Sequence, residues 1–172
     1  KFKMYAARKM VLMIILVSIP TAVLGLLMQQ FLEDIFLSSV LAVGLALLVT
    51  GVVLLLISRI PLGHKTIDGI KGRDALFIGL VQGIATIPGI SRSGSTISAG
   101  LFCGLDKEFA IRFSFLMSIP AILGAAVLKL AKVSAQDLAL NAAPYLLGTL
   151  VAALVGYLCI RWLLNLLKKN QF

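Results

Sequence analysis

Long apolar runs separated by short polar stretches dominate this sequence. Four of them are at least 18 residues long and cover residues 11–28, 36–58, 110–130 and 143–164. Runs of this length are typical of helices that cross the roughly 30 Å hydrocarbon core of a membrane. In the second run, Ala42, Ala46 and Thr50 recur every four residues, which predicts a small-residue face for close helix packing.

The middle of the chain carries a fifth apolar run that is interrupted. Residues 75–90 end in Pro88-Gly89 and are followed at once by the polar string Ser91-Arg92-Ser93-Gly94-Ser95-Thr96. The apolar residues after this string, 97–104, would reach only about 12 Å as a helix. We therefore predict a re-entrant hairpin over about residues 75–105, in which two half-helices meet at a polar tip. The second half-helix is expected to begin near Ser95 or Thr96.

The composition agrees with a membrane domain. Hydrophobic residues make up 60% and charged residues 13% of the 172 residues, whereas soluble domains are roughly half apolar and a quarter charged. The expected fold is all-α: a polytopic membrane protein with about five apolar segments and a re-entrant half-helix hairpin. Residues 1–172 are expected to form a single transmembrane domain. Because the chain begins with Lys1 rather than Met, we expect it to be part of a longer protein.

The net charge of +9 does not indicate a nucleic-acid-binding protein, because the Lys and Arg residues lie in short loops between apolar runs. If the hairpin returns to the face that it left, 13 of the 16 cationic residues lie on one face, two on the other, and Arg92 at the tip. The positive-inside rule makes the first face cytoplasmic. A segment that crossed fully would divide the loop cations 10 to 5, which fits the rule less well.

The polar groups of the predicted tip are donors or carry positive charge. The Arg92 guanidinium offers five N–H donors in a fork that matches phosphate oxygens, and the serine and threonine hydroxyls add further donors. Gly89 and Gly94 let backbone amides approach a ligand, and a helix N-terminus favours an anion. The tip therefore predicts a site for an anionic phosphate group. The alternative is a polar turn whose hydroxyls cap the half-helices while Arg92 extends to the membrane surface.

Two serines outside the string share one face of the 110–130 run. Ser114 and Ser118 are four residues apart, so they either line the site or bond to carbonyls of their own helix.

The string from Pro88 to Ile97, PGISRSGSTI, closely resembles the second signature of the undecaprenyl-diphosphate phosphatase family, the bacitracin-resistance proteins of bacterial membranes. The segment FSFL at 113–116, followed by Pro120 and Gly124, is similar to another family segment, and the resemblance extends over essentially the whole chain. The family's earlier Glu-rich signature, which ends in a Ser-Ser-Thr-Gly-His string, and its last span have no counterpart here.

The resemblance implies a membrane-integral hydrolase that converts undecaprenyl diphosphate to undecaprenyl phosphate and phosphate. This reaction recycles the lipid carrier of cell-wall peptidoglycan synthesis. The expected location is the bacterial inner membrane, with the active site toward the outer face. The resemblance makes Arg92 and Ser91 the catalytic candidates. The substrate-binding candidates are Gly89, Ser93, Gly94, Ser95 and Thr96.

The resemblance also implies a divalent cation, Mg²⁺ or Ca²⁺, as cofactor. The broken segment contains no carboxylate or histidine that could hold a metal ion or activate a nucleophile. We therefore expect the metal ligands to lie outside this chain and the chain by itself to be incomplete for catalysis. The expected partners are a polyprenyl diphosphate lipid and the membrane, with a homodimer as one candidate assembly.

Two other functions remain open from the sequence. Half-helix ends that meet inside the membrane also bind anions in transporters, so a transporter or flippase of polyprenyl phosphate or another lipid-linked anion is the alternative. A membrane scaffold without a ligand is the third, and it predicts that Arg92→Ala has no effect.

Overall fold

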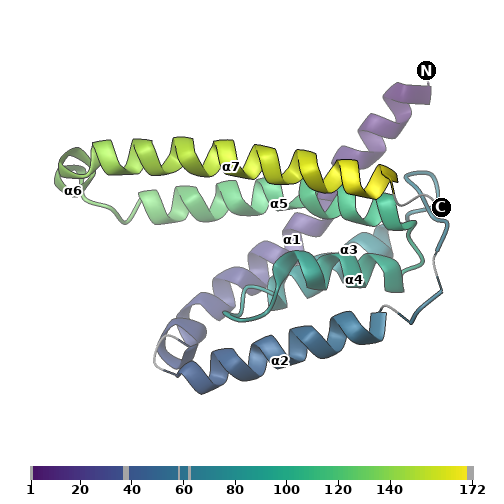
Figure 1. Ribbon diagram of the computed structural model, residues 1–172, viewed down its shortest axis with the longest axis horizontal. Coiled ribbons are helices and arrows are strands. Elements are labelled where there is room, and N and C mark those ends of the chain that lie inside the picture. The colour runs from purple at the N-terminus through teal and green to yellow at the C-terminus, as the bar shows by residue number, and fades with distance from the viewer. Residues whose placement is uncertain (1, 37–38, 58, 62, 170–172) are drawn as a thin grey trace. The chain divides into compact units, whose positions relative to one another are not determined.

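The computed structural model describes residues 2–36, 39–57, 59–61 and 63–169. Within these ranges the regular elements are all helices. One isolated β-bridge pairs Lys65 with Leu105 in parallel. The helices, shown in Figure 1, are α1 (Phe2–Phe36), α2 (Val40–Ile57), α3 (Gly72–Ile84), α4 (Arg92–Phe102), α5 (Lys107–Leu130), α6 (Ala135–Leu140) and α7 (Ala142–Lys169).

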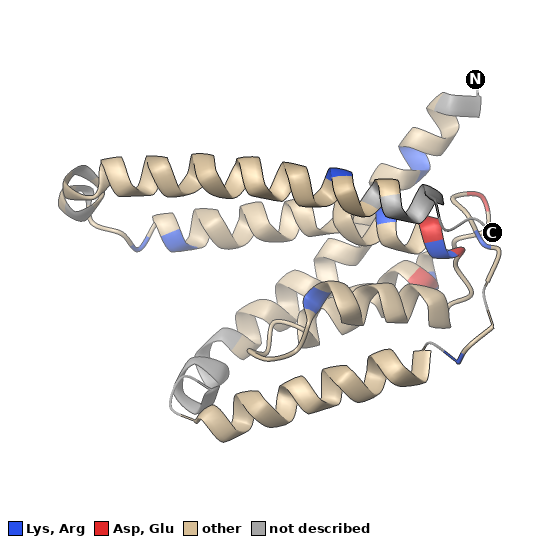
Figure 2. Cartoon of the chain, in the orientation of Figure 1, with Lys and Arg blue, Asp and Glu red and all other residues tan. Residues whose placement is uncertain are grey.

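Four of these helices are long and apolar enough to cross a membrane. The candidate spans are Met4–Met28, Val40–Ile57, Lys107–Leu130 and Ala142–Leu163. Their apolar side chains are largely uncovered by protein: Leu48 and Leu55 of α2, for example, are 67% and 69% exposed. Charged residues gather mainly at helix ends and in connecting loops, with long uncharged stretches of helix between them (Figure 2). The prediction of an all-α polytopic membrane protein is confirmed.

The interrupted apolar run forms two short helices, as predicted. The helix α3 has 13 residues and α4 has 11, lengths of roughly 20 and 16 Å that cannot cross a hydrocarbon core of about 30 Å. The two helices pack against each other, and the rings of Phe77 and Phe102 lie 6.0 Å apart between centroids.

The predicted start of the second half-helix, near Ser95 or Thr96, was wrong. The helix begins at Arg92 because Ser91 is its N-cap: the Ser91 backbone is extended and its hydroxyl oxygen accepts a hydrogen bond from the Gly94 N–H. The first half-helix also ends early, at Ile84, and turns occupy residues 85–90. Most of the polar string therefore lies in the first turns of a helix rather than in a loop.

The chain divides into two compact units, Lys1–Leu123 and Gly124–Phe172. The first contains α1 to α4 and most of α5, and the second contains the end of α5 with α6 and α7. All the residues of the predicted site lie in the first unit. The prediction of one transmembrane domain over residues 1–172 stays a prediction.

Within the first unit, α1 and α3 approach closely because α3 presents glycines. A Cβ atom at Gly79 would lie 2.4 Å from the Val17 carbonyl oxygen, and one at Gly83 would lie 2.6 Å from Leu24 Cβ. Hydrogen bonds add to this contact: the Gln82 amide donates to Thr21 Oγ1 at 3.2 Å, and the Thr21 hydroxyl lies 2.9 Å from the Gly79 carbonyl oxygen. Small residues that let helix backbones approach are typical of membrane helix pairs.

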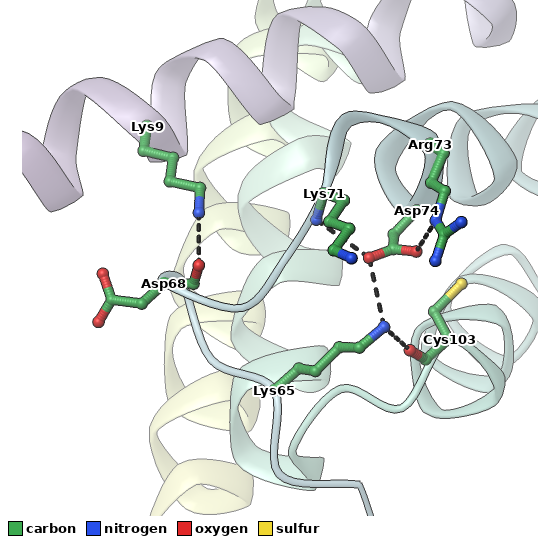
Figure 3. Close-up of polar contacts among 7 residues, drawn as sticks. All are labelled: Lys9, Lys65, Asp68, Lys71, Arg73, Asp74 and Cys103. Carbon is green, nitrogen blue, oxygen red and sulfur yellow. Dashed lines mark hydrogen bonds and ion pairs between the residues drawn. The ribbon is translucent and has the colours of Figure 1, made fainter.

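A charged clamp holds the end of the hairpin that lies farthest from the tip (Figure 3). Lys65 Nζ donates to the Cys103 carbonyl oxygen at 2.7 Å and lies 3.5 Å from Asp74 Oδ2. The same carboxylate accepts a hydrogen bond from the Lys71 N–H at 3.0 Å, although Asp74 is only 7% exposed. The loop before α3 thus ties the first turn of α3 to Cys103, the residue that follows α4.

We predict that Asp74→Ala lowers the thermal stability of the detergent-solubilised protein. The substitution leaves the Lys71 N–H without its cap and Lys65 without its counter-ion, at a cost of about 1–3 kcal/mol. The matched control is Asp68→Ala, because the exposed Asp68 contacts Lys9 only through its backbone carbonyl. Equal melting temperatures for both variants would contradict the structural role of Asp74.

We also predict that Gly79→Val separates α1 from α3. The added side chain would meet the Val17 backbone, and overpacking of this kind costs about 1–3 kcal/mol. The control is Gly51→Val in α2, where an added Cβ has no atom within 4 Å. The measurement is the fraction of each variant that stays monodisperse on heating in detergent; a Gly79 variant as stable as the Gly51 variant would refute the close contact.

Candidate functional site

The turn before α4 packs directly against α2. Gly89 has a φ angle of +92°, and a Cβ atom there would lie 2.6 Å from the Val43 carbonyl oxygen and 2.8 Å from Ala46 Cβ. Only glycine combines this backbone conformation with so close an approach. The predicted small-residue face of α2 is confirmed at Ala46 and Thr50, which both contact the turn.

Ser91 organises the start of α4. Its hydroxyl oxygen lies 3.1 Å from the Gly94 nitrogen and its carbonyl oxygen accepts from the Ser95 N–H at 2.9 Å. A Cβ atom at Gly94 would lie 2.9 Å from that hydroxyl oxygen, so glycine leaves room for the cap. Because Ser91 Oγ acts as an acceptor here, its own proton remains available to donate to a ligand.

Arg92 is the first residue of α4 and the only charged residue between Asp74 and Asp106. It is partly buried, and within the part of the chain that the structure describes, no hydrogen bond or ion pair engages its guanidinium group. The guanidinium therefore keeps its five donors beside the amide end of a helix, where the helix dipole also favours negative charge. This combination of fixed positive charge and donors suits an anion.

The other predicted site residues of α4 differ in how far they are buried. Ser93 is exposed and Ser95 is partly buried, both in the first turn of α4. Thr96 is 2% exposed, and its hydroxyl oxygen lies 2.9 Å from the Arg92 carbonyl oxygen and 2.6 Å from Ser114 Oγ. Its hydroxyl is thus engaged within the protein. The predicted contacts of these residues with substrate stay predictions.

The two serines of α5 make different hydrogen bonds. Ser114 is 4% exposed and its hydroxyl meets that of Thr96, so it braces α4 from α5. Ser118 instead donates to the carbonyl oxygen of Phe115, in its own helix, at 2.7 Å.

Sequence reasoning placed Thr50 only on a packing face and did not connect it with the site. Its hydroxyl bonds to both Gly89 and Ser91. The available signal was that Thr50 is the one polar side chain of α2, a helix otherwise built from apolar residues and glycine.

The hairpin tip does not fit a divalent cation. Among the residues that the structure describes, no three His, Cys, Asp or Glu side chains come together to hold a metal ion. Around Arg92 the groups are hydroxyls, amides and a guanidinium, whereas Mg²⁺ and Ca²⁺ require oxygen ligands that include carboxylates. A phosphate oxygen meets these groups favourably, and a cation does not.

The similarity of this chain to known proteins extends along almost its whole length. A family model described as bacitracin resistance protein BacA matches residues 2–172. Among relatives named undecaprenyl-diphosphatase, the one from Desulforapulum autotrophicum is 47% identical over 160 residues, covering 93% of this chain and 57% of the relative. The relative from Carboxydothermus hydrogenoformans is 42% identical over 163 residues, covering 93% and 62% respectively.

A shorter relative from Methanothermobacter thermautotrophicus is 44% identical over 162 residues, covering 92% of this chain and 88% of the relative. The chain spans about three-fifths of the length of the first two relatives. The family model, however, matches this chain from its second residue to its last, and the resemblance of the polar string at the start of α4 lies within that match. The chain therefore belongs to the bacitracin resistance protein BacA family.

Proposed function

We propose that this chain takes part in the hydrolysis of undecaprenyl diphosphate to undecaprenyl phosphate and phosphate. The observation that carries the proposal is the Arg92 guanidinium, which is unpaired among the described residues and stands at the N-terminal end of a half-length helix. Family membership and the names of the relatives support hydrolysis over transport or a scaffold role.

The geometry of the first turn of α4 suits a diphosphate. Guanidinium binds two phosphate oxygens through parallel hydrogen bonds, and the free amides at a helix N-terminus bind a third. The Ser91 hydroxyl has a proton to donate to the same group. These contacts stabilise the negative charge that develops on the phosphate oxygens during phosphoryl transfer.

The reaction also needs a group that activates the attacking water. No Asp, Glu or His occurs from Ala75 to Leu105, and Asp74, at the clamp end, is already paired with Lys65, so the tip of the hairpin does not provide one. In this proposal the activating group and any ligands of the divalent cation come from outside the hairpin, and the hairpin binds and orients the substrate.

We further propose that the protein lies in the bacterial inner membrane with the tip toward the outer face. The clamp end of the hairpin joins the start of α3, which holds Arg73, to the preceding loop, which holds Lys65 and Lys71. The positive-inside rule places such a cationic end in the cytoplasm. The tip is the opposite end of the same hairpin. The polyprenyl tail would lie among the exposed apolar side chains of the spans.

We predict that Arg92→Ala lowers kcat/KM for phosphate release about 100-fold when it is made in a protein of the relatives' length that contains this chain, referred to below as the full-length protein. Loss of a charged pair of hydrogen bonds costs roughly 3 kcal/mol, which corresponds to this factor. Arg92→Lys keeps the charge without the fork and should recover only part of the activity. Arg73→Ala is the control, because Arg73 lies at the far end of the hairpin with its side chain 78% exposed. Activity of Arg92→Ala within threefold of the wild type would refute the assignment.

We also predict that the purified 172-residue chain releases no phosphate from a polyprenyl diphosphate, with or without Mg²⁺ or Ca²⁺. The tip of the hairpin offers charge stabilisation but no general base, because no Asp, Glu or His occurs from Ala75 to Leu105. The same assay on the full-length protein provides the positive control. Clear metal-dependent turnover by the 172-residue chain would show that the hairpin or its neighbours supply the missing group.

A further inference from the structure

Thr50 makes contacts that a threonine in an apolar helix does not usually make. Such a hydroxyl ordinarily bonds to a carbonyl one turn back in its own helix, as Thr149 does with Tyr145 at 2.7 Å. Thr50 instead reaches out of α2 to the hairpin turn. Its hydroxyl donates to the Gly89 carbonyl oxygen at 3.2 Å and accepts from the Ser91 N–H at 3.1 Å.

These two hydrogen bonds match the capacity of the group. A hydroxyl has one proton to donate and lone pairs to accept, so one Thr50 side chain satisfies a carbonyl and an amide on either side of Ile90. Gly89, Ile90 and Ser91 are partly buried, and a buried backbone N–H or C=O without a partner destabilises the conformation that contains it. Thr50 thus fixes the turn in one position relative to α2.

Packing along α2 supports the same function. Val43, Ala46, Thr50 and Leu54 recur at three- and four-residue spacing and so lie on one helical face. Val43 and Ala46 meet Gly89, and Leu54 Cδ2 lies 3.4 Å from the position of a Cβ atom at Gly94. This face of α2 therefore contacts both the turn at Gly89 and the first turn of α4. The Thr50 hydroxyl lies between these two contacts.

We propose that Thr50 is a positioning residue for the anion site. By holding the Ser91 amide it fixes the N-cap of α4, and with it the direction of the free helix amides and the start of the Arg92 side chain. This inference rests on the proposed function, in which those groups bind the diphosphate.

The test is Thr50→Val in the full-length protein. Valine keeps the shape of threonine but removes the hydroxyl, so α2 keeps its packing while the turn loses both hydrogen bonds. We expect kcat for phosphate release to fall about tenfold with a smaller change in KM and in melting temperature. Thr50→Ser retains the hydroxyl and should restore most of the rate. Thr149→Val, which removes a hydroxyl bonded only to its own helix, should leave kcat unchanged.

Hydrogen–deuterium exchange gives a measurement that does not depend on catalysis. Thr50→Val should speed exchange in a peptide covering residues 87–95, and Thr50→Ser and Thr149→Val should not. If the wild-type protein releases no phosphate, the proposed function fails, while the exchange data still test whether Thr50 holds the turn. Unchanged exchange in Thr50→Val would overturn the proposal. Faster exchange with an unchanged kcat would also overturn it, as would a kcat for Thr50→Ser as low as that for Thr50→Val.

Discussion

A chain that turns round inside a membrane must satisfy its backbone polar groups without bulk water. The hairpin of this protein meets that constraint with side-chain hydroxyls. Ser91 caps α4 from within the turn, and Thr50 bonds to the turn from α2. Among the described residues, the guanidinium of Arg92 takes no part in these hydrogen bonds. The Arg92 guanidinium is left available for an anion.

The two ends of the hairpin use charge in opposite ways. At the clamp end, the Asp74 carboxylate is paired with Lys65 and with a backbone amide, so positive and negative groups compensate each other. At the tip, the positive charge of Arg92 has no carboxylate to balance it within the described residues. A site of this kind favours a ligand with negative charge. Because the chain belongs to the bacitracin resistance protein BacA family, we propose a lipid diphosphate as this ligand.

Positioning of the tip depends on helices outside the signature string. The glycines of α3 let it lie against α1, Gly89 lets the turn lie against α2, and Ser114 of α5 holds Thr96. Each contact is short and involves backbone or small side chains, which leaves little room for adjustment. The first turn of α4 is therefore held from several sides.

The sequence by itself determined the spans, the interrupted segment and the chemistry of the string that follows Pro88. These follow from apolar run length and residue type, which are local properties. It did not locate the start of α4, because whether Ser91 caps a helix or lies in a loop depends on the packed turn before it. Tertiary structure alone showed that Thr50 bonds to the turn, that Thr96 faces Ser114, and that Lys65 pairs with Asp74. Those pairs join residues 9 to 39 positions apart, on different elements, and no periodicity in a single sequence records which of them meet.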